Sequence, residues 1–125
     1  MKRSAILCGC ALTALITFAE PPVASAAGAI ALGRCTRIGW SNNYDSRSGA
    51  RAEASSQCRA NGDGTCEVIV TVRGLCGAVA ISGNCSARGW AYAGSRGEAE
   101  RLALNECGNH GGRGCTIHRW VCDGR

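Results

Sequence analysis

The sequence predicts an α+β domain, rich in disulfides, in which one ββαβ unit occurs twice about a pseudo-twofold axis. Three observations lead to this prediction. Ser46–Cys66 and Ser95–Cys115 align without a gap at an offset of 49 residues. The segments on either side of each stretch are apolar or alternating, as is typical of strands. Eight cysteines remain after removal of a predicted signal peptide, an even number that indicates a disulfide framework in an exported chain.

Residues 1–26 are predicted to be a cleaved signal peptide. Two basic residues open it, and Ala5–Ala19 is apolar but too short to span a membrane. Ala24–Ala26 then forms an A-x-A cleavage site. The exported chain would begin at Ala27 or Gly28 and act outside the cell, in the periplasm or in the cell envelope. The alternative is a lipoprotein, because Leu7–Cys10 loosely matches a lipid-attachment box, but too few residues precede this box.

Residues 27–125 are too few for two ordinary domains, so we expect a single duplicated domain. Repeat one is predicted at 28–76 and repeat two at 77–122. This part has 12 Arg and eight interspersed acidic residues, a net charge of +4 that does not indicate a nucleic-acid partner. It contains five aromatic side chains and no Phe. The core must therefore use small aliphatic side chains, and disulfides should contribute much of the stability.

Each repeat is expected to begin with two strands. The short apolar runs Ala29–Leu32 and Ala78–Ile81 predict the first strands. The segments Ile38–Tyr44 and Gly89–Ala93 carry Trp and Tyr at alternate positions, which predicts the second strands. The sheet they form is expected to be antiparallel or mixed.

A helix should follow the second strand of each repeat. In the second repeat, Ser95 and Glu98 form a capping box, in which the Ser95 oxygen accepts from the Glu98 amide and the Glu98 side chain reaches back. Gly108 is expected to end this helix. In the first repeat Ser46 or Ser48 is the cap. The buried stripes are expected to be Ala50, Ala54 and Cys58 in the first helix and Ala99, Leu102, Ala103 and Cys107 in the second.

The last strand of each repeat begins after a Gly-rich turn. In the first repeat the alternation predicts one face made of Cys66, Val68, Val70 and Val72 and another made of Glu67, Ile69 and Thr71. In the second repeat the same period predicts one face with His118 and Trp120 and the opposite face with Ile117 and Val121.

The cysteine positions predict two short staples between a helix end and the next strand, Cys58–Cys66 and Cys107–Cys115. Each would contribute about 2.5 kcal/mol in the loop-entropy model. The other four cysteines could pair across the copies, as Cys35–Cys85 and Cys76–Cys122, or within them, as Cys35–Cys76 and Cys85–Cys122. A disulfide that closes any of these loops would stabilise the fold by about 4 kcal/mol, so loop entropy does not select a pairing.

The sequence contains no convincing catalytic or metal-binding pattern, so we expect a non-enzymatic protein without cofactors. Ser95 lies in a near-match to the hydrolase nucleophile motif, but a helix cap explains it better. His110 lies in a Gly-rich turn, and His118 lies on the last strand. Two histidines and no free cysteine make a poor metal site. The alternative function is a small secreted hydrolase that uses Ser95 or His118.

The function that we expect is an exported binding or inhibitor-like module for an unknown protein or envelope partner. Strand periodicity places Trp40, Asn42 and Tyr44 on one face, and likewise Trp90 and Tyr92. If the helices cover one face of the sheet, the aromatic residues could line the other face beside Arg, as in many binding patches. The alternative is that the Trp residues fill the core between helix and sheet. The binding candidates are Trp40, Tyr44, Trp90, Tyr92, His118, Arg119 and Trp120.

The repeated motifs resemble a bacterial exported family, domain-of-unknown-function family 4189, over Gly28–Cys122. "CGAVA" at Cys76–Ala80 and "RWVC" at Arg119–Cys122 are the most specific parts of the resemblance. The resemblance implies the fold and export, and it supplies no catalytic residue. The family's usual cysteines correspond to Cys58, Cys66, Cys76, Cys107, Cys115 and Cys122. The resemblance therefore marks Cys35 and Cys85 as an added pair and favours a bond between them.

Overall fold

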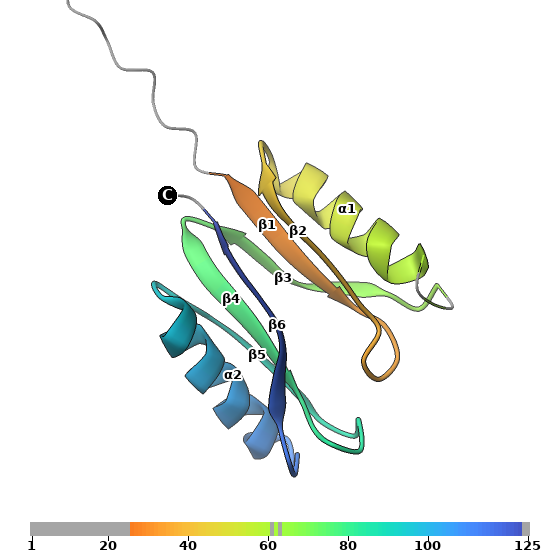
Figure 1. Cartoon of the computed structure of the whole chain (residues 1–125), viewed down its shortest axis with the longest axis vertical. Coiled ribbons are helices and arrows are strands. Elements are labelled where there is room, and N and C mark those ends of the chain that lie inside the picture. The colour runs from red at the N-terminus through yellow and green to blue at the C-terminus, as the bar shows by residue number, and fades with distance from the viewer. Residues whose placement is uncertain (1–25, 61, 63, 124–125) are drawn as a thin grey trace, which may run out of the picture.

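The computed structural model describes residues 26–60, 62 and 64–123, which form two ββαβ units (Figure 1). The elements of the first unit are β1 (Ala27–Leu32), β2 (Ile38–Tyr44), α1 (Arg47–Ala60) and β3 (Glu67–Arg73). Those of the second are β4 (Leu75–Ile81), β5 (Arg88–Ala93), α2 (Arg96–Asn109) and β6 (Thr116–Asp123). The predicted α+β class and duplicated unit are confirmed. The strands form two three-stranded antiparallel sheets, β2-β1-β3 and β5-β4-β6, rather than one sheet.

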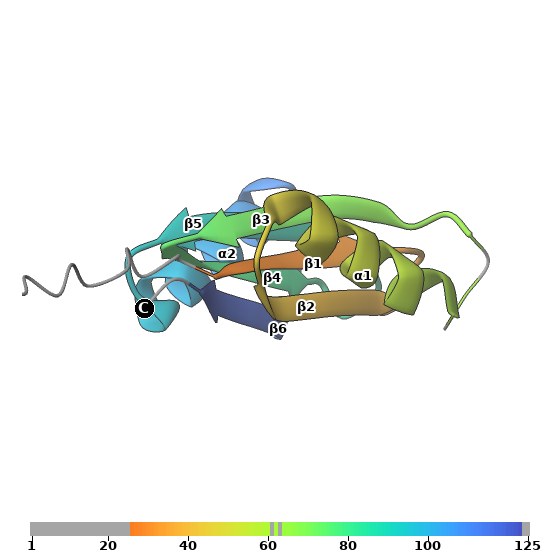
Figure 2. The same cartoon turned by 90° about the horizontal axis from the view of Figure 1, so that it is seen from above.

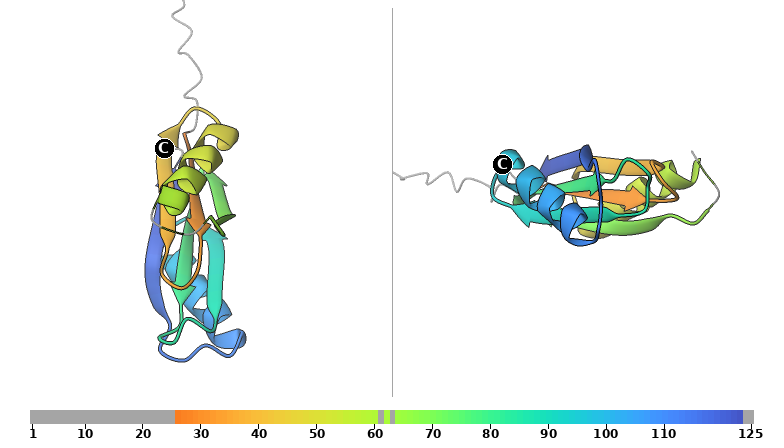
Figure 3. Two further views of the ribbon diagram at one scale, coloured as in Figure 1. Left: turned by 90° about the vertical axis from the view of Figure 1, so that its right-hand side faces the viewer. Right: turned by 90° about the horizontal axis from the view of Figure 1, so that it is seen from below.

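The two sheets pack face to face, and each carries its helix on the outer face (Figures 1 and 3). Viewed from above, β3 and β5 lie along one side of the molecule, and β2 and β6 lie along the other (Figure 2). The core between the sheets consists of Ile30, Leu32, Val70, Val72, Val79, Ile81 and Val121. Small side chains, mostly Ala, fill the two outer layers between sheet and helix.

The central strands β1 and β4 are buried on both faces because two layers cover them. Along β1, Ala29 and Ala31 face α1, whereas Ile30 and Leu32 face the other sheet. The helices can approach their sheets closely because the facing residues are so small. A Cβ added at Gly39 would overlap the backbone oxygen of Ala54 in α1. The same contact recurs between Gly89 and α2.

Four disulfides link the eight cysteines of the described residues. The two short staples lie where the sequence predicts them, as Cys58–Cys66 and Cys107–Cys115, with Cα separations of 6.0 and 6.2 Å. Cys35–Cys85 joins the β1–β2 loop of one unit to the β4–β5 loop of the other. Cys76–Cys122 joins facing residues of β4 and β6 within the second sheet. The pairings Cys35–Cys76 and Cys85–Cys122 do not form.

A β-bulge at the same place in β3 and β6 overturns the predicted alternation of these strands. In β3 the extra residue is Ile69, so Val68 packs on the α1 side while Val70 and Val72 face the other sheet. In β6 the extra residue is His118. The predicted single face of Cys66, Val68, Val70 and Val72 is therefore wrong, because a bulge reverses the phase of the alternation. For the same reason Ile117 and Val121 lie on opposite faces, rather than on a shared one.

A second bulge near the end of β2 separates Trp40 from Tyr44. The register of β1 and β2 shifts between Ala27 and Ala29, and Asn43 has a positive φ of 59°. Trp40 packs at the margin of the core between the sheets, whereas Tyr44 packs beside α1. The prediction that they share a face is therefore wrong. No register shift occurs between β4 and β5.

The helix caps agree in part with the predictions. The oxygens of Ser46 and Ser95 accept from amides three residues later. The Glu98 carboxylate pairs with Arg101, at 2.6 Å, instead of reaching back to the cap. The prediction that Gly108 ends α2 is also wrong. The helix closes at Gly111, which has a φ of 84° and donates to the Gly108 carbonyl in a Schellman motif completed by Gly112.

Candidate functional site

The aromatic residues singled out in the sequence lie on two opposite sides of the molecule. Strand β2, which carries Trp40, lies on the same side as β6, which carries His118, Arg119 and Trp120 (Figure 2). Strand β5, which carries Trp90 and Tyr92, lies on the other side next to β3, and the Tyr92 hydroxyl contacts β3. The Trp residues were expected either on an exposed face of the sheet or between helix and sheet, and both expectations are corrected. The faces away from the helices pack against each other, and Trp40 lies at the margin of that contact rather than between helix and sheet.

The side formed by β2 and β6 carries two stacked pairs of Trp and Arg. The Arg119 guanidinium lies 3.6 Å from the ring centre of Trp40, and that of Arg96 lies 3.9 Å from the ring centre of Trp120. Trp120 is 38% exposed. A cavity of about 180 Å³ runs between the strands here and is lined by Trp40, Asn42, Arg119, Trp120, Val121 and Cys122. We call Trp40, Asn42, Arg96, Arg119 and Trp120 the β6 edge surface.

Arg119 is electrostatically unusual within this surface. Its Nε is buried and has no hydrogen-bond partner among the described residues. Burial lowers the pKa of its guanidinium. No acidic side chain of the described chain pairs with it. By contrast, Arg96 bonds Glu100 at 2.6 Å. Arg119 therefore stacks one face on Trp40 and has no acidic partner among the described residues.

The duplication supplies an internal comparison for this surface. At an offset of 49 residues, Arg119 corresponds to Val70, and Trp120 corresponds to Thr71. Val70 is fully buried in the core between the sheets. Packing at this position thus requires only an aliphatic side chain. The charged residue in the second unit needs another explanation, because desolvating an unpaired charge has a cost.

On the opposite side, no Arg of the described residues stacks on a Trp. Trp90 and Tyr92 are 40% and 43% exposed. The Tyr92 hydroxyl bridges to β3, accepting from the Thr71 amide and lying 3.3 Å from the Ile69 carbonyl. Tyr44 lies apart from both sides, beside α1. Its partial burial and, to a smaller extent, Glu53 raise the pKa of Tyr44.

The candidate catalytic residues do not come together. Ser95 accepts from the Glu98 amide at the start of α2. His118 Nε2 lies 3.3 Å from Thr116 Oγ1, and His110 Nδ1 lies 3.0 Å from the Arg88 carbonyl oxygen. No triad is assembled among residues 26–60, 62 and 64–123. This part of the chain also contains no cluster of three metal-ligating side chains.

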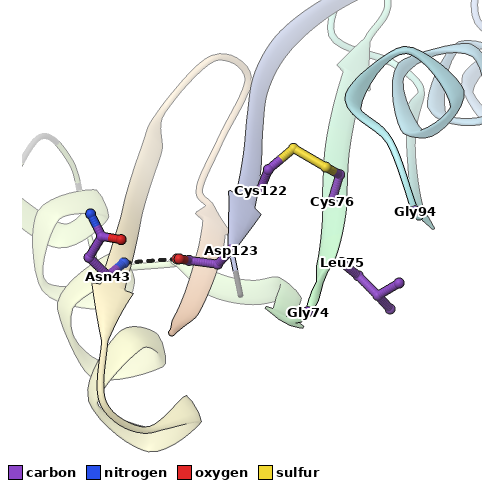
Figure 4. A pocket seen from close by; sticks show the side chains of 7 residues that line it. All are labelled: Asn43, Gly74, Leu75, Cys76, Gly94, Cys122 and Asp123. Carbon is purple, nitrogen blue, oxygen red and sulfur yellow. Dashed lines mark hydrogen bonds between the residues drawn. A yellow bond between two sulfur atoms is a disulfide. The ribbon is translucent and has the colours of Figure 1, made fainter. Parts of the chain in front are cut away.

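A second cavity of about 180 Å³ contains polar groups that the sequence analysis missed (Figure 4). The Asp123 carboxylate accepts from the Asn43 amide at 2.8 Å, a contact between the two units. Asp123 is 8% exposed, and its counterpart in the first unit is Gly74. A position-by-position comparison of the two repeats places Arg119 and Asp123 among the many positions that differ, so it could not have singled them out.

Two comparisons relate the chain to known proteins. The NMR structure of Rv1813c from Mycobacterium tuberculosis is similar at 26% identity, with 98% of each chain covered and a TM-score of 0.56. No functionally curated protein matches. Across the described residues, no helix is both long and apolar enough to cross a membrane. A family model described as a domain of unknown function, DUF4189, matches residues 27–122. With this match over most of its length, the chain belongs to the DUF4189 family.

Proposed function

We propose that this protein is an exported, non-enzymatic binding module that holds a partner protein on the β6 edge surface. The observation that carries the proposal is the Arg119–Trp40 stack. It places an unpaired cation where the equivalent position of the first unit holds a core valine. Trp and Arg are the residues most enriched at the energetic centres of protein interfaces. Four disulfides support an oxidising compartment.

Binding is tested with the oxidised protein immobilised as bait for proteins of the producing cell's envelope and medium. W120A should lose the partner that the unaltered protein retains, because the exposed ring and its Arg96 contact disappear. The matched control is W90A, which removes an equally exposed Trp from the opposite side. Equal retention by W120A and the unaltered protein would contradict the proposal.

Export is tested by the mass of the protein recovered outside the cytoplasm. We expect a chain that begins at Ala27 or Gly28, because the A-x-A site precedes these residues. Ala27 is the first residue of β1 and is fully buried, so cleavage after Ala26 would leave the strand complete. A lipid-modified chain that begins at Cys10 would contradict this expectation.

A further inference from the structure

The outer strands β3 and β6 hold equivalent places in their sheets, but their free edges differ. Each is paired on one side only, with β1 and β4 respectively. Each helix packs mainly on the other two strands of its own sheet, α1 on β1 and β2 and α2 on β4 and β5. The helices therefore cover β3 and β6 less than they cover the other strands of each sheet. An uncovered edge presents main-chain N–H and C=O groups that another strand can bind.

On β3 the fold closes this edge with a side chain. The Thr71 amide, which points away from β1, donates to the Tyr92 hydroxyl at 3.3 Å. The same hydroxyl lies 3.3 Å from the Ile69 carbonyl oxygen and donates to it. One tyrosine thus occupies two of the outward main-chain groups of β3. An added strand would have to displace it.

On β6 the corresponding groups have no such partner. Trp120 faces Ala78 in the β4–β6 ladder as Thr71 faces Ala29 in the β1–β3 ladder. The outward groups that correspond to those bound by Tyr92 are therefore the Trp120 N–H and the His118 C=O. The place of Tyr92, two residues after the strand's Trp, is held by Asn42. No side chain of the described residues bonds the outward groups, and Asn42 makes no hydrogen bond there.

The surroundings of this open edge indicate the chemistry of its ligand. The cavity between β2 and β6 follows the edge from Arg119 to Cys122. Trp40 and Trp120 supply apolar walls, and the Arg119 guanidinium lies beside them without an acidic partner in the described chain. A guanidinium matches the two oxygens of a carboxylate in a bidentate pair. An acidic side chain next to an extended backbone would satisfy both features.

We infer that an extended segment of a partner protein adds to the free edge of β6 as a fourth strand of the second sheet, with a carboxylate of that segment bound by Arg119. This inference deepens the proposed function and rests on it. Main-chain hydrogen bonds to β6 would supply affinity, and Arg119 would select an acidic residue at one position. Because Tyr92 blocks the edge of β3, the partner would bind only the edge of β6, although the two strands hold equivalent places in their sheets.

The first test selects random twelve-residue peptides displayed on phage against the oxidised protein. Enriched peptides should carry Asp or Glu within a strand-like pattern, in which β-branched residues occur at alternate positions. Their affinity should fall about tenfold or more on R119V, which restores the residue type of Val70. The matched control is R101A, which removes the same charge from the exposed face of α2. Enriched peptides that lack acids, or that bind R119V equally, would overturn the inference, as would a failure to enrich any.

The second test asks whether the backbone is read. A selected peptide is synthesised in two forms, N-methylated at alternate residues in either of the two frames. Only every other residue of an added strand donates to β6, so one frame should lose about tenfold in affinity or more, and the other little. Slower hydrogen exchange of the Trp120 amide in the complex should accompany binding. Equal losses in both frames, or unchanged exchange, would overturn strand addition.

The outcomes separate this inference from the broader proposal. If W120A loses the native partner but the two methylated frames behave alike, the β6 edge surface binds its partner without strand addition. If W120A keeps the native partner and R119V binds every peptide, both proposals fail. The other occupant to be tested at the edge of β6 is a second copy of this chain. A dimer in solution that the selected peptide does not dissociate would overturn the inference.

Discussion

Arg119 and Val70 show at the level of single residues how a duplicated fold separates packing from function. Both follow a bulge in the last strand of their unit, and both face the other sheet. Val70 is buried among aliphatic side chains, whereas Arg119 stacks on Trp40 and leaves a buried Nε unpaired. The contact with the Trp ring compensates in part for the lost hydration. A carboxylate bound to the guanidinium would offset the rest of this desolvation cost.

Ser95 gives a prediction at the same scale, because its hydroxyl caps α2. S95A should lower the free energy of unfolding by about 1 kcal/mol, since the Glu98 amide loses its acceptor. Urea unfolding measures the change. S46A, which removes the equivalent cap of α1, should have an effect of similar size. Partner binding should not change in either variant. If Ser95 were instead a nucleophile, S95A would leave the free energy of unfolding unchanged and abolish an enzymatic activity.

Packing between helix and strand depends on small residues at the level of elements. Gly39 and Gly89 lie where α1 and α2 cross their second strands, and a Cβ at either position would overlap helix backbone. Backbone cannot move aside as a flexible side chain can. Both helices therefore lie close to their sheets only because these positions have no side chain.

G89A should destabilise the protein by about 3 kcal/mol, because α2 must shift away from β5 to admit the methyl group. The matched control is G97A, within α2, where an added Cβ meets nothing within 4 Å. Alanine is the better helix former, so G97A should stabilise by about 0.5 kcal/mol. Denaturation of both variants checks the pair. Similar effects from the two would show that helix propensity, and not the close approach, governs Gly89.

Sequence periodicity predicted these elements well but failed where a strand contains one extra residue. The strand over Ile38–Tyr44 was predicted with its observed bounds. The faces of β3 and β6 were predicted wrongly, because alternation cannot reveal the bulges at Ile69 and His118. Each bulge depends on the register with a neighbouring strand, which is a long-range property. The bulge at Asn43 also depends on the register with a neighbouring strand. Only the first unit contains it, so the internal repeat does not reveal it either.

Across the whole molecule, one sheet was expected where the structure has two packed face to face. A signal for this arrangement was present in "GAIAL" and "GAVAI", which are apolar at every position. A strand that is apolar on both faces needs a cover on both, and one helix covers only one. The open edge of β6 could not be predicted, because it depends on whether a side chain from another strand reaches the outward groups.

The Cys35–Cys85 bond gives a prediction for the whole molecule, since it joins the loops of the two units across 50 residues of chain. Replacing both cysteines by alanine should lower the free energy of unfolding by about 4 kcal/mol through the entropy of the unfolded chain. The fold should remain, because the core between the sheets does not use this bond. Circular dichroism and urea unfolding under oxidising conditions measure the two effects. Loss of the native spectrum would instead make the bond necessary for folding.

The face-to-face packing of the sheets has a consequence for how such a protein can diversify. A lone ββαβ unit would leave Ile30, Leu32, Val70 and Val72 in water, so one unit is complete only against another. Two identical units would meet as a symmetric dimer, and every change to one edge would appear on both. Joining the units through Gly74 removes that constraint. One edge can then stay closed by Tyr92 while the other acquires Arg119 and Trp120, so a single chain carries one recognition edge instead of two.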